Sequence, residues 1–256
     1  MRIRLDAALV KRGLASTRSE ASRLIDEGSV TVSGAFADKS SRLVGPDEPI
    51  EVLVARRFVS RGGEKLEHAL VHFGVDVAGR SVLDAGASTG GFTDCALQRG
   101  AARVYAADVG RNQLHERIKD DPRVTWRDGV NVRDIGPDDL PFPCSLVVAD
   151  LSFISLTKVV RSLVTCATPE AGHPVPMMVL LVKPQFEAGR AEASKGRGVI
   201  TDPAIHAEAC ESVAREVEAC GATPVGIVES PIKGGEGNTE FLMFVECPTV
   251  SVGCGA

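Results

Sequence analysis

A glycine-rich turn between a short apolar run and a helical segment constrains the fold of this chain more than any other feature. Residues 82–83 are apolar and are followed by Asp84, and residues 92–99 have the composition of a helix. A glycine turn in this position lets a ligand approach the backbone, and the start of the helix offers free N–H groups. The stretch therefore predicts a strand, a nucleotide-binding turn and a helix, which together form the opening unit of an α/β sheet.

The spacing of these glycines distinguishes between two classes of ligand. Turns that bind dinucleotides follow G-x-G-x-x-G, whose second glycine makes room for a pyrophosphate, whereas this turn reads G-x-x-x-G-G after Asp84. A carboxylate there would repel a phosphate but suits the ammonium group of S-adenosylmethionine (SAM), which carries no phosphate. The next predicted strand, residues 103–107, ends at Asp108, whose carboxylate can accept hydrogen bonds from ribose hydroxyls. We therefore expect SAM rather than NAD, with an ordinary tight αβ turn as the alternative.

Length and composition limit the classes of protein to which the chain can belong. With 256 residues, 44% of them hydrophobic, it can bury one large domain and one small one. No apolar run approaches the roughly 18 residues that span a bilayer, and early charges at Arg2, Arg4 and Asp6 interrupt any signal-peptide core. The seven cysteines form no C-x-x-C pair, which indicates neither a disulfide framework nor zinc. We expect a cytoplasmic protein without a metal site.

Residues 1–54 read as a compact unit of their own. Apolar residues at helical spacing predict two helices, and Thr17 with Glu20 three residues later has the pattern of a capping box at the start of the second. Short β-branched runs at residues 30–32 and 50–54 predict strands. The pattern indicates a small α+β domain.

This segment resembles an S4 domain, a small module that binds RNA. The resemblance lies in four motifs: Arg4-Leu5-Asp6, Gly13-Leu14-Ala15, the helix Ser19–Ile25, and Gly28–Gly34. Residues 1–57 contain ten Lys and Arg against eight Asp and Glu, in a chain whose net charge is −5. Basic side chains on such a domain contact phosphates and give affinity without sequence choice, although a surface of solvated arginines is the alternative. The expected RNA contacts, including three in a basic loop of the large domain, are Arg4, Lys11, Arg12, Arg18, Arg23, Arg61, Arg190, Lys195 and Arg197.

The rest of the chain reads as a linker (55–59), a large domain (60–248) and a tail (249–256). From residue 81 onward apolar strands alternate with helices, which predicts a doubly wound α/β sheet whose ligands bind beyond the carboxyl ends of the strands. Near-continuous apolar runs such as 176–182 are typical of parallel strands buried on both faces. Four charged residues end these runs and are expected at one edge of the sheet: Asp84, Asp108, Asp150 and Lys183.

The large domain resembles the FtsJ-type RNA ribose 2′-O-methyltransferases, whose mark is a Lys-Asp-Lys-Glu tetrad. The matching positions are Lys65, Asp150, Lys183 and Glu240. Together with the S4-like segment and the motifs at 84–92 and 182–187, the resemblance to the TlyA family extends over almost all of the chain. Members are described as ribosomal RNA (rRNA) cytidine 2′-O-methyltransferases and, by an older name, as hemolysins. The resemblance implies a Rossmann-like SAM-dependent methyltransferase domain, with a mostly parallel seven-stranded sheet, behind the S4 domain.

The resemblance also implies roles for these residues. Lys183 is expected to act as a base toward a ribose 2′-hydroxyl or to orient it, and Lys65 to hold that hydroxyl or a neighbouring phosphate. Asp150 and Glu240 would orient the two ammonium groups. The expected partner is rRNA in ribosomal subunits, with no membrane involved, and the oligomeric state stays open. The expected SAM contacts are Asp84, Gly86, Ser88, Thr89, Gly90, Gly91, Phe92, Asp108, Asp128, Asn131 and Asp150.

Two other functions are alternatives. Membrane-lytic activity, implied by the older name, would need a spanning or strongly amphipathic apolar segment. The most amphipathic predicted helix, residues 204–220, carries four glutamates, which disfavours anionic lipid. A ribosome-assembly factor that binds SAM without catalysis is the other alternative, and the occupied tetrad positions argue against it.

Overall fold

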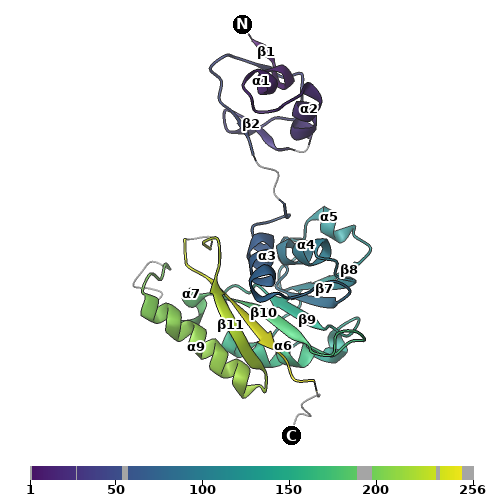
Figure 1. Cartoon of the computed structure of the whole chain (residues 1–256), viewed down its shortest axis with the longest axis vertical. Helices are drawn as coiled ribbons and strands as arrows, with labels where there is room; N and C mark the ends of the chain where they lie inside the picture. The colour runs from purple at the N-terminus through teal and green to yellow at the C-terminus, as the bar shows by residue number, and fades with distance from the viewer. Residues whose placement is uncertain (1, 27, 54–56, 189–197, 235–236, 250–256) are drawn as a thin grey trace. The chain divides into compact units, whose positions relative to one another are not determined.

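The computed structural model describes residues 2–26, 28–53, 57–188, 198–234 and 237–249 (Figure 1). The chain divides into two units, Met1–Arg57 and Phe58–Ala256. One hydrophobic cluster lies in the first unit and two lie in the second. Each unit therefore has the apolar interior of a separate domain.

The N-terminal unit packs two helices, α1 (Leu5–Lys11) and α2 (Arg18–Asp26), with short antiparallel strands. These strands are β1 (Ile3–Arg4), β2 (Val30–Val32), β3 (Ala35–Phe36), β4 (Leu43–Val44) and β5 (Ile50–Val52). β2 is the central strand of a sheet with β3 and β5, and β1 pairs with β4. Leu5 and Leu9 of α1 pack with Ile25 of α2 in the core.

The start of α2 shows the predicted capping interaction. Thr17 Oγ1 accepts the backbone N–H of Glu20 at 3.1 Å. Glu20 Oε2 reaches back and accepts the backbone N–H of Ser16 at 2.7 Å. These bonds satisfy backbone donors that have no partner inside the helix.

The large unit is built on a mostly parallel sheet of seven strands. These are β6 (Ser81–Ala85), β7 (Arg103–Asp108), β8 (Val124–Asp128), β9 (Leu146–Ala149), β10 (Met177–Val182), β11 (Thr223–Glu229) and β12 (Phe241–Glu246). Their order is β11-β12-β10-β9-β6-β7-β8, in which β12 is antiparallel to both of its neighbours and the remaining pairs are parallel. The order reverses between β6 and β9, where ligands of such sheets bind. The predicted doubly wound sheet is confirmed.

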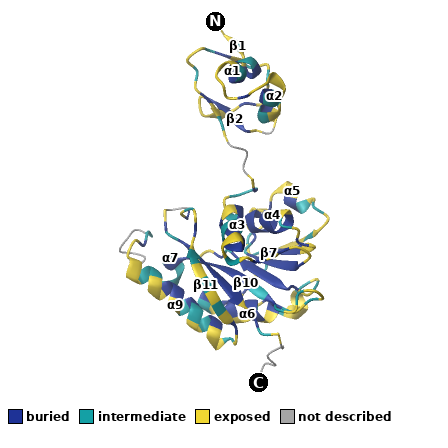
Figure 2. Ribbon diagram, in the orientation of Figure 1, coloured by how far each residue is buried: buried dark blue, intermediate teal, exposed yellow. Residues whose placement is uncertain are grey.

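Helices cover both faces of this sheet. Figure 1 shows α3 (Gly62–Phe73) and α4 (Gly91–Gln98) on one face, with α6 (Val160–Cys166) and α9 (Pro203–Ala219) on the other. A hydrophobic core lies on each face of the sheet, and alternate residues of β6 point into one or the other. Val82 packs in the core beneath α3 and α4, and Leu83 packs in the core beneath α6 and α9. The central strands are accordingly dark in Figure 2, which marks buried residues. The shorter helices are α5 (Glu116–Lys119), α7 (Pro184–Glu187) and the 3-10 turns η1 (Pro137–Asp139) and η2 (Leu156–Lys158).

The sequence pattern also predicts helices over residues 113–118 and 156–166, and both are shorter in the structure. The helix predicted over 113–118 forms only as α5, which begins after His115, where the imidazole Nδ1 accepts the N–H of Arg117 at 3.1 Å. The helix predicted over 156–166 is divided into η2 and α6 at Val159, whose φ of −126° is outside the helical range. In both places the segment is partly helical as predicted, but its backbone leaves the helical conformation at one end or in the middle.

Candidate active site

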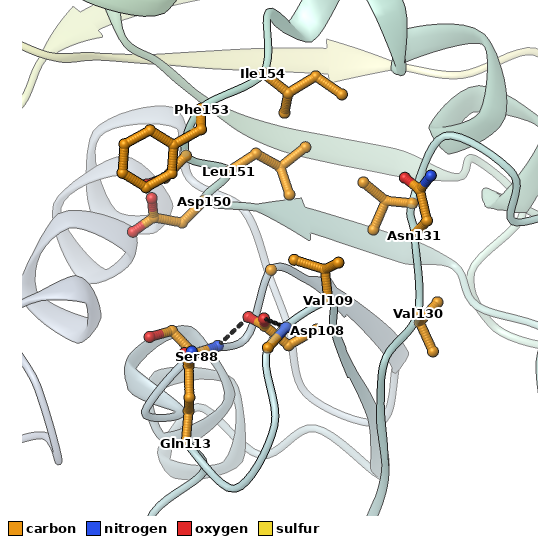
Figure 3. Close-up of a pocket in the computed structure, with 14 residues that line it drawn as sticks. Ser88, Asp108, Val109, Gln113, Val130, Asn131, Asp150, Leu151, Phe153 and Ile154 are labelled. Carbon is orange, nitrogen blue, oxygen red and sulfur yellow. Dashed lines mark hydrogen bonds between the residues drawn. The ribbon is translucent and has the colours of Figure 1, made fainter.

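Three of the predicted site residues lie at the carboxyl ends of parallel strands in the central part of the sheet. Asp108 is the last residue of β7, Asp150 follows β9, and Lys183 follows β10. A cavity of about 510 Å³ opens at this edge (Figure 3). Its wall consists of the turn after β6, the segment after β7, residues 130–132 and the loop 150–154. The predicted active-site edge is therefore also the place where the fold leaves room for a ligand.

The turn after β6 depends on its glycines. Gly86 has a left-handed φ of 85°, and a Cβ there would lie 2.7 Å from the carbonyl oxygen of Asp150. Gly90 has a φ of 92° and is the N-cap of α4, while a Cβ at Gly91 would overlap the hydroxyl of Ser60. Only glycine fits these three positions without strain, and the result is a backbone exposed to a ligand at the start of α4.

A second cavity of about 90 Å³ lies against the same turn. It shares part of its wall with the larger cavity, so the two adjoin. The predicted cofactor residues that line this smaller cavity are Gly86, Ser88, Thr89, Gly91, Phe92 and Asp150, and Ser60 and Gly62 line it as well.

Asp108 connects the glycine turn to the end of β7. Its Oδ2 accepts the backbone N–H of Ser88 at 2.7 Å, and its Oδ1 accepts the backbone N–H of Gly110 at 2.6 Å, as Figure 3 shows. Each carboxylate oxygen has a second lone pair that a ligand hydroxyl can use. Asp108 thus shapes the cavity and remains able to bind a diol.

Asp84 lies in the core rather than in the cavity wall. Its side chain is fully buried within β6, and Oδ2 accepts the hydroxyl of Thr93 at 2.6 Å. Burial raises the pKa of this carboxyl to about 7. The second oxygen, Oδ1, is buried without a hydrogen-bond partner among the described residues. A buried acceptor without a partner is costly unless a donor from a ligand or water reaches it.

Asp128 and Asn131, two of the expected SAM contacts, differ in position. Asn131 lines the main cavity, with its amide donating to Asp134 at 2.8 Å. Asp128, at the end of β8, accepts the backbone N–H of Asn112 at 2.8 Å and borders a small neighbouring hollow that Asp108 also lines. Asp128 therefore holds the segment after β7 and is not part of the main cavity wall.

The predicted tetrad is assembled as two ion pairs. Lys183 Nζ lies 2.6 Å from Asp150 Oδ1 and donates to Ser152 Oγ at 3.1 Å. Lys65 Nζ, on α3, lies 2.5 Å from Glu240 Oε2, just before β12. Both lysines are buried. Because Asp150 and Ser152 belong to the cavity wall, the first pair borders the ligand space directly.

Ser152, Val109 and Phe153 are among the cavity residues that the sequence reasoning did not predict. Ser152 adds a hydroxyl beside the tetrad, Val109 is 73% exposed after β7, and Phe153 is 93% exposed with a left-handed φ of 64°. The ring of Phe153 lies 5.5 Å from that of Phe186. An aromatic residue so close in sequence to a predicted active-site acid was the available signal, because loops at strand ends present side chains to the ligand.

Several predicted RNA contacts already have protein partners in the N-terminal unit. Arg4 and Arg18 pair with Asp6 at 3.0 and 2.9 Å, and together they lower the pKa of this buried carboxyl to about 2. Arg12 donates to three backbone carbonyls of the segment 45–48, at 2.7 to 2.9 Å. These three residues thus stabilise the domain in addition to any contact with RNA. Lys11, Arg23 and Arg61 are exposed, and Arg190, Lys195 and Arg197 lie outside the described residues.

Comparison with known proteins agrees with this architecture. The family model of the FtsJ-like methyltransferases matches residues 58–246, and that of the S4 domain matches residues 3–50. A relative from Mycobacterium tuberculosis, named 16S/23S rRNA (cytidine-2'-O)-methyltransferase TlyA, is 44% identical over 97% of this chain and 91% of its own. A solved structure described as a candidate hemolysin from Streptococcus thermophilus superimposes with a TM-score of 0.72 at 38% identity, over 96% of this chain and 88% of that one.

The older name also occurs among the relatives. Hemolysin A of Brachyspira hyodysenteriae is 39% identical over 94% of this chain and 98% of its own. In the described part of the chain, no helix has the length and apolarity that crossing a membrane requires. The two domain matches, their order and the extent of these similarities lead to one assignment: the chain belongs to the TlyA family of FtsJ-like methyltransferases with an N-terminal S4 domain.

Proposed function

We propose that this protein uses SAM to methylate the 2′-hydroxyl of a cytidine in rRNA. The observation that carries the proposal is the Lys183–Asp150 pair at the border of the cavity formed by the glycine turn. The relative named as a 16S/23S rRNA (cytidine-2'-O)-methyltransferase supports the choice of rRNA and of cytidine. The S4 domain supports an RNA partner.

The two cavities have the chemistry that SAM requires. No Lys or Arg is among the described residues that line them, so they suit a ligand without phosphate. Asp108 would bind the ribose hydroxyls, and the exposed Val109 with Val130 would cover the adenine. The unpartnered oxygen of Asp84 would accept a hydrogen bond from the ammonium group of SAM. The N–H groups at the start of α4 would bind the carboxylate of SAM. When bound there, SAM supplies an electrophilic methyl group.

Lys183 is the residue that we assign to the reacting hydroxyl. A lysine accepts a proton only in its neutral form, and Lys183 Nζ forms an ion pair with Asp150 Oδ1 at 2.6 Å. Lys183 therefore acts as a base once that charge pair is broken or compensated, and otherwise it orients the hydroxyl lone pair toward the methyl group. Lys65, oriented by Glu240, would hold the hydroxyl oxygen or a neighbouring phosphate.

The exposed Phe153 gives the RNA side of the site a stacking surface. A ribose hydroxyl in a folded RNA reaches a cavity when its nucleotide leaves the stack, and proteins compensate by stacking the base on an aromatic ring. Phe153 stands at the border of the cavity, within the loop that carries Asp150. Together with basic residues of the S4 domain, it would present the nucleotide to the methyl donor.

The test compares variants of Lys183 on ribosomal subunits with labelled SAM, under single-turnover conditions. Lys183→Met should lower the methylation rate by about 10²-fold or more, the range that general-base residues supply, while the Kd for SAM stays near the wild-type value. Lys183→Arg keeps the charge but cannot lose its proton, so retained activity in this variant would favour the orienting role.

Lys119→Ala, on α5, is the matched control and should methylate at the wild-type rate. Near-normal turnover by Lys183→Met would refute the role of Lys183. A wild-type protein that binds SAM and ribosomal subunits but transfers no methyl group would instead be an assembly factor.

A further inference from the structure

Glu187 is a partly buried carboxylate that the proposed mechanism does not use. It is the last residue of α7, four positions after Lys183. Its Oε1 accepts the backbone N–H of Leu156 at 2.8 Å, and its Oε2 accepts the hydroxyl of Ser155. Burial raises the pKa of the carboxyl, while these two donors and Lys158 lower it. A carboxylate that has lost part of its hydration is retained at a cost, so its two contacts call for an explanation.

Both contacts fall on the end of one loop. Residues 150–154, between β9 and η2, form a continuous part of the wall of the main cavity. Within this loop Phe153 is held in the left-handed region, which costs on the order of 1 kcal/mol or more for a residue other than glycine. A loop with such a backbone needs surrounding contacts to keep one conformation. Beyond its far end, Ser155 and Leu156 receive such contacts from Glu187.

Glu187 links the same two segments as the Lys183–Asp150 ion pair, namely the loop after β9 and the segment after β10. On the cavity side, Lys183 contacts Asp150 and Ser152. Beyond the cavity, Glu187 contacts Ser155 and Leu156. The loop after β9 is therefore attached at both of its ends to the segment that follows β10, and the pair of reacting groups lies at one of the two attachments.

We propose that Glu187 is a positioning residue of the methyltransferase site. By accepting hydrogen bonds from Ser155 and Leu156, it fixes the loop 150–154 so that the loop closes the cofactor cavity and holds Asp150 against Lys183. The inference rests on the proposed function, because it assigns the cavity to SAM. It predicts that loss of Glu187 affects binding of SAM as well as the rate, whereas loss of Lys183 affects the rate alone.

The experiment measures the Kd for SAM, the methylation rate on ribosomal subunits and the melting temperature of full-length variants. Glu187→Ala leaves the donors of Ser155 and Leu156 without their acceptor and should raise the Kd for SAM about 10-fold, or about 1.4 kcal/mol, and lower the rate as much. Glu187→Gln keeps an acceptor for Leu156 and offers its amide to Ser155. This conservative variant should restore both quantities to within about 3-fold of wild type, or about 0.65 kcal/mol.

Glu208→Ala is the matched control, because this glutamate lies on α9 beside the same groove as Glu187 but is exposed. It should leave the Kd and the rate unchanged. If Glu187→Ala does not fold, Ser155→Ala removes one of the two contacts from the loop side and should raise the Kd in the same direction. A folded Glu187→Ala with wild-type Kd and rate would overturn the inference, as would a Gln variant no better than the Ala variant. Failure of the wild-type protein to bind SAM would instead overturn the proposed function.

Discussion

At the scale of single residues, Asp84 shows how burial changes the chemistry of a side chain that the sequence presents as an ordinary acid. The carboxyl has a pKa of about 7 instead of 3.8 because it is desolvated inside β6 and has one hydroxyl donor, Thr93. Desolvation disfavours the charged form. Near neutral pH the residue is therefore divided between its acid and its carboxylate, and a cationic ligand group would shift it toward the carboxylate.

The raised pKa of Asp84 makes the free energy of unfolding depend on pH. Because the folded-state pKa of Asp84 is raised, its contribution to the free energy of unfolding is present below pH 3.8 and is lost as the pH rises toward about 7. Asp84→Asn removes this titration, so the stability of the variant should fall less than that of wild type over this pH range. Urea unfolding at several pH values measures the difference. Parallel curves for the two proteins would contradict the assignment.

At the scale of elements, the turn between β6 and α4 makes the cavity by bringing two backbones into contact. A Cβ at Gly86 would lie 2.7 Å from the Asp150 carbonyl and 2.8 Å from Leu151, so any side chain would displace the loop that faces the turn. Glycine in this position is thus required by the approach of the two segments as well as by its left-handed φ.

These two requirements can be separated by mutation. Gly86→Ala should raise the Kd for SAM about 10-fold or more, because the loop with Asp150 must move. Gly100→Ala is the control, since Gly100 has nearly the same φ, 87°, but its Cβ would meet only ordinary contacts at 3.5 Å. Both variants should lose about 1–2 kcal/mol of stability from the left-handed backbone, and only the first should lose affinity for SAM, measured by calorimetry. Equal Kd values in the two variants would show that the close approach is unimportant.

At the scale of the whole molecule, RNA binding and methyl transfer are proposed to belong to two different units, each with its own hydrophobic core. The S4 domain would provide affinity for RNA through basic residues, and the large unit would carry out the chemistry. The boundary is marked by residues that belong to the large unit: Phe58 is buried in its core, and the backbone N–H of Val59 donates to Asp94 at 2.8 Å. Removal of the first unit should therefore leave the second one intact.

Deletion of residues 1–54 tests this division. The shortened protein should bind SAM with the wild-type Kd, whereas its affinity for rRNA should fall and depend less steeply on salt, because fewer phosphates are neutralised. Filter binding at several salt concentrations measures both quantities. An unchanged affinity for rRNA would mean that the S4 domain does not anchor the substrate.

Much of the fold could be predicted from local patterns. Apolar runs predicted the strands of the large unit. The sequence pattern also predicts that a helix starts at Asp202 or Thr201, and Asp202 is the N-cap of α9, where its carboxylate accepts the N–H of Ala204 at 2.8 Å. These signals are strong because they depend on residues a few positions apart. The break at Val159 and the shortened α5 were missed, since packing against the rest of the fold sets them.

The sequence by itself predicted the glycine turn and the acids at the strand ends, because motif spacing and strand periodicity are properties of consecutive residues. The tetrad positions were predicted from the resemblance to the FtsJ-type family. Only the tertiary structure decided that Lys65 pairs with Glu240, 175 positions away, and Lys183 with Asp150. It also decided that Asp84 is buried and that Glu187 holds the loop after β9. Partners, burial and pKa depend on which segments the sheet brings together, and that arrangement is a property of the whole fold.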